Sequence, residues 1–448
     1  MSFPAYPDYK DSGVTWLDVV PSHWTVTALK RRLKIVGGST PKSDVDDYWD
    51  GDIPWITPAD LSRLPDLFIR DALRSITTDG LASCGTSLVP SGSVILSTRA
   101  PIGSLGIAAV ELCTNQGCKA LVSNEVNSTF LAYLLSICSA ELNVRGRGST
   151  FLELSADELG AFQISFPPPD EQTAIATFLD RETAKIDALM AEQERLIALL
   201  KEKRQAVISH AVTKGLNPNA PMRDSGIEWL GQIPAHWQIE PLKRLADPQT
   251  SITYGIVQAG PDIPDGVPYI RTSDMSGEEL PLDGYLRTSA EIDAAYARSK
   301  VASGDLVIAI RATIGKPLIV PAELAGANLT QGTAKFSPGE KVLARFVQLV
   351  LGSTGASAEF DRISKGSTFK EITLDMLRRF RIPLPPLDEQ QRICDWVDGP
   401  FGKVGGLLET ASEAKLVLQE RRAALISAAV TGKIDVRGLA VTSEMEAA

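Results

Sequence analysis

The side chains best suited to acid–base or metal chemistry are few and scattered in this sequence. It has three histidines, two of them in the pairs His23-Trp24 and His236-Trp237, and no acid–base or metal-binding cluster surrounds either pair. Catalytic and metal sites need several such groups held close together. We therefore expect no catalytic residue and no metal site. Each His-Trp pair should instead anchor the N-terminus of the segment that follows it.

Motifs that indicate nucleic-acid enzymes are incomplete. Gly315-Lys316-Pro317 lacks the earlier glycine and the hydroxyl residue of a phosphate-binding loop. Pro7-Asp8-Tyr9-Lys10 lacks the second carboxylate of a metal-dependent nuclease. The Pro-Pro pairs lead into Leu-Asp or Pro-Asp, unlike the Asn/Asp-Pro-Pro-aromatic sequence of adenine methyltransferases. These absences favour a chain without an active site; a nuclease, a methyltransferase or a fusion of both is the competing interpretation.

Cationic side chains on loops could bind DNA through its phosphates and base edges. The formal net charge is −10, so such cations would have to line one groove while Asp and Glu lie elsewhere. For each cation the alternative is a solvated surface position, and for Arg99 and Arg311, in equivalent turns, a structural salt bridge. The DNA-binding candidates are Lys42, Arg63, Arg99, Lys119, Arg145, Arg147, Arg271, Arg311, Lys316, Lys335, Lys365 and Lys370.

The sequence contains a long internal repeat. Residues 12–31 and 225–244 share S-G-x-x-W-L…P-x-H-W…L-K-R without a gap, 213 positions apart. Near the far end of each half, Gly148-Ser149-Thr150-Phe151 matches Gly366-Ser367-Thr368-Phe369, and P-P-x-D-E-Q follows in both, now 218 positions apart. Such a duplication predicts two copies of one structural unit, each with a variable middle between fixed ends.

Each half ends in a segment that favours a long helix. Residues 170–213 contain no glycine or proline; we expect Asp170 to cap the helix and Gly215 with Pro218 to end it. About 40 residues would make a rod of roughly 60 Å, which we interpret as a spacer and not as a surface helix of one domain. Alternating steps of four and three predict a coiled-coil seam at Ile175, Leu179, Glu182, Ile186, Leu189, Gln193, Leu196, Leu200, Lys203 and Val207.

The second helical segment departs from the first. Gly399-Pro400-Phe401-Gly402 and Gly405-Gly406 predict a break or distortion, with a firm helix only from about Leu407 to Val430. Its seam would include Leu407, Ala411, Ala414, Leu418 and Leu425. Neither helix can bury its apolar stripe alone, so we expect the two to pair antiparallel.

The resulting fold class is α+β. It comprises two duplicated mixed α/β domains separated by two long antiparallel helices, with an approximate two-fold relation. The expected boundaries are 1–166 for the first domain, 167–216 for its helical spacer, 217–384 for the second domain, 385–434 for the second spacer and 435–448 for a flexible tail.

The two variable middles share several short segments. Buried strands are expected at 94–98 and 306–310, Asn115-Gln116-Gly117 matches Thr330-Gln331-Gly332, and Lys119 is matched by Lys335 one place displaced. Residues 37–42 have no counterpart in the second half, which has residues 251–257 instead. A shared scaffold with different loops suits two modules that read two different ligands.

Composition points to a soluble cytoplasmic protein. The five cysteines are odd in number and unevenly spaced, which argues against a disulfide framework. No stretch approaches the ~20 apolar residues of a membrane span, and the polar N-terminus does not predict a signal peptide.

The two S-G-x-x-W-L openings, the two P-P-x-D-E-Q helix starts and the paired G-S-T-F segments resemble specificity subunits of Type I restriction–modification systems over nearly the whole chain. Gly37-Gly38-Ser39-Thr40-Pro41 with Ile53-Pro54-Trp55 is similar to one class of their target-recognition domains. Residues 254–258 with 267–271 resemble another class.

This resemblance implies that each domain reads one half of a split, asymmetric DNA site. It implies that the helices set the gap between the halves and dock two methyltransferase subunits, to which two restriction/motor subunits are added. The assembly would methylate adenine or cut DNA, with S-adenosylmethionine, ATP and magnesium bound by the partner subunits and none by this chain. The alternative is a helical scaffold or an inhibitor that binds restriction–modification subunits without reading DNA.

Overall fold

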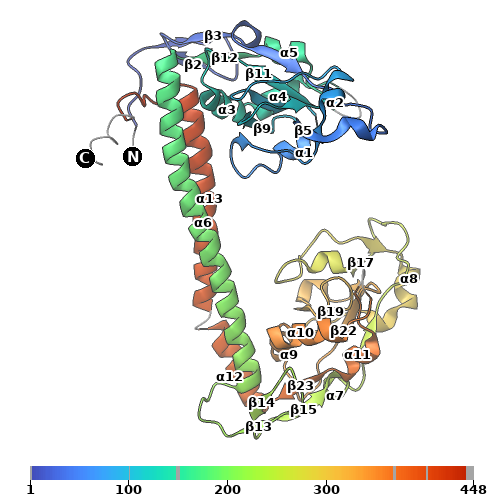
Figure 1. Ribbon diagram of the computed structural model, residues 1–448. Helices are drawn as coiled ribbons and strands as arrows, with labels where there is room; N and C mark the ends of the chain where they lie inside the picture. The colour runs from blue at the N-terminus through green and yellow to red at the C-terminus, as the bar shows by residue number, and fades with distance from the viewer. Residues whose placement is uncertain (1–2, 100, 148–151, 367–369, 400–401, 440–448) are drawn as a thin grey trace. The chain divides into compact units, whose positions relative to one another are not determined.

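The computed structural model describes residues 3–99, 101–147, 152–366, 370–399 and 402–439. The chain forms two compact units: unit 1 consists of Met1–Gln193 and Ala414–Ala448, and unit 2 of Glu194–Glu413. Each unit combines a globular part with a section of paired helix (Figure 1). The segments 148–151 and 367–369, which carry most of the repeated G-S-T-F motif, lie outside the described residues. No helix in the described ranges is long and apolar enough to span a membrane.

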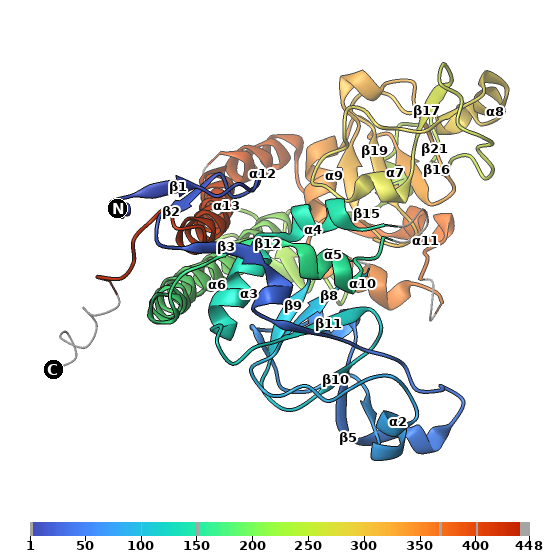
Figure 2. The ribbon, with the colours of Figure 1, turned by 90° about the horizontal axis from the view of Figure 1, so that it is seen from above.

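The globular part of unit 1 is built on short strands. Its elements are β1 (Tyr9–Asp11), β2 (Val19–Pro21), β3 (Thr25–Ala28), β4 (Lys34–Gly37), β5 (Trp49–Ile56), α1 (Pro58–Leu61), β6 (Phe68–Ile69), β7 (Ser75–Ile76), α2 (Thr78–Ala82), β8 (Val94–Ser97), β9 (Leu105–Ala108), β10 (Cys113–Thr114), β11 (Cys118–Val122), α3 (Ser128–Ser136), α4 (Ser139–Arg145), α5 (Ala156–Ala161) and β12 (Gln163–Phe166). They form a sheet of order β4-β11-β8-β9-β6, a second of order β10-β5-β7, the pair β12-β3 and the hairpin β1-β2. Figure 2 shows β5, β10 and α2 at one end of this globular part.

Unit 2 repeats this plan. Its elements are β13 (Met222–Asp224), β14 (Gln232–Pro234), β15 (Gln238–Pro241), α7 (Leu242–Leu245), β16 (Thr253–Tyr254), β17 (Val267–Ile270), β18 (Arg287–Thr288), α8 (Ala290–Ala295), β19 (Leu306–Ala309), β20 (Pro317–Ile319), β21 (Asn328–Leu329), β22 (Thr333–Phe336), α9 (Ala344–Leu351), α10 (Thr354–Ile363), α11 (Leu374–Arg379) and β23 (Arg381–Leu384). The order β16-β22-β19-β20 matches β4-β11-β8-β9, and β21-β17-β18 matches β10-β5-β7. The predicted buried strands are β8 and β19, in which every residue is buried. The duplication seen in the sequence is therefore a duplication of topology.

The first helical segment is one helix, α6 (Pro169–Lys214). It begins one residue before Asp170, which the sequence analysis expected to be the cap, because proline is well tolerated where the first N–H groups have no partner within the helix. It ends, as predicted, at Gly215, whose φ of +76° is the left-handed conformation that closes a helix. In unit 1 the start of α6 shares a core with the end of α13 (Gly402–Val430). In unit 2 the end of α6 shares a core with α12 (Leu387–Asp398). End meets start in both units, so the pairing is antiparallel.

The seam of α6 follows the prediction in its first turns and in one of its two rows throughout. Ile175, Leu179 and Ile186 are buried, but Leu189 and Leu196 are 52% and 43% exposed, and Lys203 is exposed too. The predicted positions Gln193, Leu200 and Val207 are half-buried, whereas the other row lies one residue further on, at the half-buried Met190, Ile197 and Arg204. Sequence periodicity identified the stripe but displaced one of its rows by one residue, because Leu189 and Leu196 are as apolar as Met190 and Ile197.

The predicted interruption of the second helix is confirmed between Asp398, where α12 ends, and Gly402, where α13 begins. The expected start of firm helix near Leu407 is wrong, because α13 already includes Gly405 and Gly406. Leu407 is 55% exposed and does not belong to the seam, whereas Ala411 and Leu425 are buried and Ala414 and Leu418 are half-buried, as predicted.

A buried glutamate joins the start of α6 to the N-terminal hairpin of unit 1. Oε1 of Glu171 accepts hydrogen bonds from the Tyr6 hydroxyl at 2.5 Å and from the Trp24 indole at 2.9 Å, and Oε2 lies 2.8 Å from Nε2 of His23. Burial, together with the nearby Glu171, holds the pKa of Tyr6 well above its ordinary value. The predicted structural role of His23-Trp24 is confirmed.

Unit 2 uses the same arrangement at the start of α12. Nε2 of His236 lies 2.8 Å from Oε2 of Glu389. Position 219, which corresponds to Tyr6, is an exposed asparagine, and the buried Trp237 indole N–H has no partner among the described residues. The hydrogen bonds of the Glu171 cluster are thus only partly reproduced in the second copy.

The glutamine that follows each of these glutamates ties the helix to its own globular part. Gln172 donates to the Pro167 carbonyl at 2.9 Å and accepts from the backbone N–H of Asn127, the cap of α3. Gln390 makes the same two bonds, to the Pro385 carbonyl and from the Leu343 N–H ahead of α9. The repeated D-E-Q triplet is therefore a structural joint.

The last residues of α13 and those beyond it complete unit 1. Gly432 has a φ of +77°, and a Cβ there would lie 2.4 Å from Cδ of Pro21 and 3.1 Å from the Trp24 ring. The Asp435 N–H donates to the Pro4 carbonyl at 2.7 Å, and Val436 is fully buried. Both residues lie in the segment expected to be a flexible tail, yet they pack against the first residues of the chain.

We predict that replacing Gly405 and Gly406 together by alanine stabilises the chain. An added Cβ meets nothing within 4 Å at either position, and alanine favours a helix over glycine by about 1 kcal/mol per residue, so the free energy of unfolding should rise by about 1–2 kcal/mol. Urea denaturation of the full chain measures it. Gly432→Ala is the matched control and should destabilise the chain, because its Cβ would clash with Pro21. Unchanged or lower stability of the double variant would contradict the prediction.

Candidate nucleic-acid interface

Two loops of unit 1 lie directly on one another at the edge of the sheets. We call residues 37–42 the glycine loop and residues 115–117 the glutamine loop. The Ser39 N–H donates to the Thr114 carbonyl at 3.0 Å, and the Thr40 hydroxyl donates to Oε1 of Gln116. Gly38 approaches so closely that a Cβ would lie 2.1 Å from the Thr114 oxygen, so only glycine fits there.

Two tryptophans hold the glycine loop of unit 1 from below. The Trp55 indole donates to the Ser39 carbonyl at 2.9 Å, and the Trp49 indole donates to the Lys42 carbonyl at 3.1 Å. The two rings pack edge to face with centroids 5.2 Å apart. Both rings are largely buried, so the loop is fixed by its backbone while the Lys42 side chain stays exposed.

Unit 2 has the same junction. Its glycine loop is residues 254–258 and its glutamine loop is residues 330–332. The Ile256 N–H donates to the Leu329 carbonyl at 2.6 Å, and the Gln331 N–H donates back to the Ile256 carbonyl at 2.9 Å. A Cβ on Gly255 would lie 1.9 Å from the Leu329 oxygen. No counterpart of residues 37–42 was expected in the second half. Gly255 is nevertheless the counterpart of Gly38, and the sequence does not reveal it because the shared bonds use backbone atoms.

Two further segments adjoin the glutamine loop in each unit. In unit 1 the Thr98 N–H donates to the Gly117 carbonyl at 2.7 Å, and the Thr98 carbonyl accepts from Leu154 at 3.0 Å. In unit 2 Ile310 makes the same bonds to Gly332 and Ile372, at 2.9 and 3.0 Å. The glycine loop, the glutamine loop and these two segments form what we call the four-segment edge.

The four-segment edge of unit 2 is hollowed by a cavity of about 400 Å³. Its lining includes Tyr254, Gln331 and the ion pair of Arg311 with Glu371. Tyr254 is 42% exposed. The cavity therefore places an exposed aromatic residue and an amide beside two carboxylates, Glu371 and Asp375, and a cation that Glu371 neutralises.

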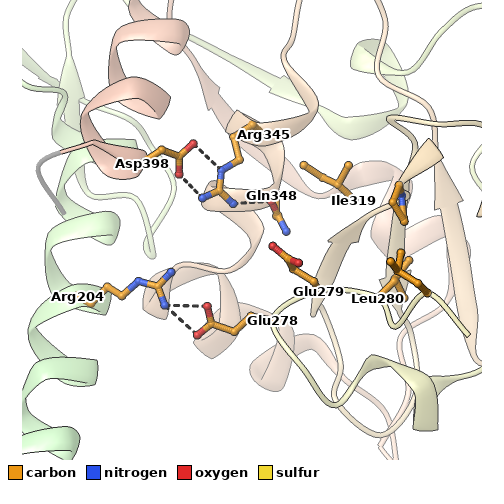
Figure 3. A pocket seen from close by; sticks show the side chains of 10 residues that line it. Arg204, Glu278, Glu279, Leu280, Ile319, Arg345, Gln348 and Asp398 are labelled. Carbon is orange, nitrogen blue, oxygen red and sulfur yellow. Dashed lines mark hydrogen bonds and ion pairs between the residues drawn. The ribbon is translucent and has the colours of Figure 1, made fainter. Parts of the chain in front are cut away.

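A larger cavity of unit 2, about 580 Å³, lies elsewhere, between its helices and its globular part (Figure 3). Its two arginines are already neutralised: Arg204 of α6 contacts Glu278 at 2.8 Å, and Arg345 of α9 pairs with Asp398 at the end of α12. Paired charges of this kind brace the helix against the domain and leave no free cation for a phosphate. We therefore do not assign DNA reading to this cavity.

The predicted cations differ widely in their surroundings. Several already have carboxylate partners: Arg99 with Glu153 at 2.6 Å, Arg147 with Glu158 at 2.7 Å, Arg271 with Asp274 at 2.8 Å, Arg311 with Glu371 at 2.9 Å and Lys370 with Asp361 at 3.2 Å. The equivalent pairs of Arg99 and Arg311 show that the structural salt bridge considered for them exists. Hydrogen bonds that Arg271 donates to Asp274 hold the pKa of Arg271 above its ordinary value.

Other predicted cations form no ion pair with any described residue. Lys42, Arg63 and Lys365 are exposed. Lys119 is half-buried, and its Nζ lies 3.4 Å from the Gln116 carbonyl. Arg145 lies over the Phe162 ring at 5.3 Å, and Lys316 donates to the Ser276 carbonyl at 2.8 Å. Lys42 and Lys119 are the two that the structure brings together, at the glycine and glutamine loops.

Lys335 lies on the opposite face of its sheet from the face that Lys119 occupies in unit 1. It is 8% exposed and donates to the Lys300 carbonyl at 2.8 Å. Successive side chains of a strand face opposite sides of the sheet, so its displacement by one place from Lys119 sends it to the opposite face. The predicted DNA contact at Lys335 would require this buried bond to open.

Sequence reasoning missed Gln116, Gln331 and Tyr254 as candidates. The signal was present, because the two glutamines occur in matching segments of the repeat. The matching segments were interpreted only as a sign of shared structure, because the DNA-binding candidates were restricted to Lys and Arg. Among the described residues, no group of three or more His, Cys, Asp or Glu side chains could hold a metal ion.

Comparison with known proteins identifies the family to which the chain is similar. The family model for the Type I restriction modification DNA specificity domain matches residues 21–198 and 259–399. The EcoBI specificity subunit of Escherichia coli is 28% identical over 329 residues, covering 72% of this chain and 69% of that protein. The MjaIX specificity subunit of Methanocaldococcus jannaschii is 39% identical over 163 residues, which span 36% of this chain and only 38% of that relative.

A solved structure has the same fold. It comes from work on complex assembly and conformational transition of the type I R-M system; it is 18% identical, has a TM-score of 0.68 and covers 92% of this chain and 98% of the solved chain. Each of the two stretches matched by the family model covers most of one copy of the topology described above. The chain belongs to the family of Type I restriction–modification DNA specificity subunits.

Proposed function

We propose that this chain is the DNA-reading, non-catalytic subunit of a Type I restriction–modification enzyme, and that each four-segment edge reads one half of a bipartite, asymmetric DNA site. The observation that carries the proposal is the recurrence of the same edge in both units, with equivalent backbone bonds from Ser39 and Ile256, Thr98 and Ile310, and Leu154 and Ile372, and with different side chains. In unit 1 the edge presents Thr40 and Lys42, and in unit 2 it presents Tyr254 and Val257. Two equivalent backbone arrangements that present different side chains would recognise different DNA sequences.

Unpaired cations at the edge support DNA as the ligand despite the net charge of −10. Lys42 and Lys119 flank the loop junction of unit 1, and Lys365 adjoins the edge of unit 2 through its backbone bonds to Glu371. Phosphate contacts of this kind position a protein on the duplex, and base contacts add sequence specificity.

The helices support a docking role. Exposed leucines on α6, at 189, 196 and 199, and Leu416 with Val417 on α13 leave apolar surface uncovered. Surfaces of this kind mark contacts with other proteins. We propose that they contribute to binding two methyltransferase subunits, to which two restriction/motor subunits are added in the cytoplasm. Those partners would bind S-adenosylmethionine, ATP and magnesium and would methylate adenine or cleave DNA.

We expect an exchange of residues 14–165 for the first domain of another family member to change only one half of the methylated site. The two edges lie in separate units, so they should read independently. The measurement is genome-wide mapping of methylated adenines in a host that expresses the exchanged chain with its methyltransferase subunit. A change in both halves would contradict modular reading. Equal binding of site and scrambled DNA by the wild-type assembly would favour the scaffold interpretation.

Gly38→Ala should weaken recognition of the half-site read by unit 1, because its Cβ would drive the glycine loop off the glutamine loop. We expect methylation of the cognate site to slow by about tenfold or more, comparable to a mismatched base pair. Gly37→Ala is the matched control: its Cβ would meet only the Lys119 side chain, at 3.6 Å, and the rate should change little. Equal effects of the two substitutions would argue against the junction as the reading surface.

A further inference from the structure

The glutamine loops share a side chain that the fold does not use. Of residues 115–117 and 330–332, only the glutamine and the glycine are common to both units. The glycine is structural, because a Cβ there would lie 3.0 Å from Cγ of Pro58 in unit 1 and 3.1 Å from Cγ2 of Thr272 in unit 2. Gln116 is exposed and its amide contacts only Thr40, while the Gln331 amide has no hydrogen bond to any described residue. Packing therefore gives no reason for glutamine at both places.

The local geometry of unit 1 aims this amide outward. The Thr40 hydroxyl donates to Oε1 of Gln116, which orients the amide and leaves both Nε2 hydrogens and one Oε1 lone pair free. Thr40 is itself held in the glycine loop that Trp49 and Trp55 fix. An oriented carbonyl and N–H pair is what binds the N6 and N7 edge of adenine in the major groove.

In unit 2 the equivalent amide lines the 400 Å³ cavity. Gln331 shares this lining with Tyr254, whose ring is 42% exposed, and with Arg311, which Glu371 neutralises. A neutral amide beside a flat apolar ring can accommodate a base edge and exclude a phosphate. The two copies thus present the same functional group in different surroundings.

We propose that Gln116 and Gln331 are specificity-determining residues, each reading the adenine of one A·T pair, one pair in each half of the site. This inference rests on the proposed function and deepens it. Guanine offers acceptors at both N7 and O6, so it would leave the amide oxygen facing another acceptor. The flanking Lys42 and Lys119 would contact phosphates and add no preference among bases.

The test uses the chain together with its methyltransferase subunit in a host without other adenine methylation, with methylated adenines mapped across the genome. Gln116→Ala should make one A·T position degenerate in the half-site of unit 1, and Gln331→Ala should do the same in the other half. Preference for adenine at that position should fall about 5- to 150-fold, the equivalent of roughly 1–3 kcal/mol. Gln163→Ala on β12 and Gln249→Ala in the turn before β16 replace exposed glutamines outside the glutamine loops and should leave both halves intact.

A gain-of-preference variant guards against loss through misfolding. Gln116→Arg should shift the preferred base at the same position from adenine to guanine, whose O6 and N7 accept from arginine. The unaltered half of the motif reports correct assembly in every variant. An unchanged motif, degeneracy in both halves, or degeneracy at a G·C pair would overturn the inference. If the wild-type assembly yielded no two-part motif, the proposed function itself would fail.

Discussion

The structure depends on a carboxylate at the start of each paired helix, buried in unit 1 and half-buried in unit 2. Glu171 is 5% exposed and takes hydrogen bonds from an indole and a phenol, with a histidine at its second oxygen. A buried charge is costly unless such partners satisfy it, so the helix start, the hairpin and the tryptophan must come together for any of them to be stable. Glu389 repeats the joint with fewer donors. Because the neighbouring glutamine accepts from the backbone N–H ahead of α3 or α9, the joint fixes the helix start against its own globular part.

The four-segment edge, which we propose reads DNA, combines a shared backbone scaffold with side chains that differ between the two units. Backbone bonds hold the glycine loop and the glutamine loop together. They require glycine at Gly38 and Gly255, because a Cβ at either position would overlap the neighbouring backbone. The other positions of the glycine loop are therefore free to differ between copies without loss of the frame. A family that must read many DNA sequences with one fold benefits from this arrangement, since substitutions there alter the ligand-facing groups and leave the core unchanged.

The repeat in the sequence was sufficient to predict two copies of one fold, antiparallel helices and the structural role of the His-Trp pairs. It could not place the second row of the α6 seam, because Leu189 and Met190 are both apolar and only packing against α13 decides between them. Nor could it show that Lys335 is buried, since strand register is fixed by pairing with distant strands. The sequence also could not reveal that Gly38 and Gly255 are equivalent. The bonds shared by the two loops use backbone atoms, so one glycine is the only residue that the two loops need to have in common.

Unit 1 combines residues 1–193 with residues 414–448, so its core can be completed only after unit 2 has been synthesised. Residues up to 413 can complete unit 2 while synthesis continues. The apolar face of Ile175, Leu179 and Ile186 shares a core with Leu425 and Ile426, which emerge more than two hundred residues later. Part of that face therefore stays uncovered while unit 2 is synthesised, an apolar surface of the kind that chaperones shield, and residues 414–439 complete the core of unit 1 afterwards.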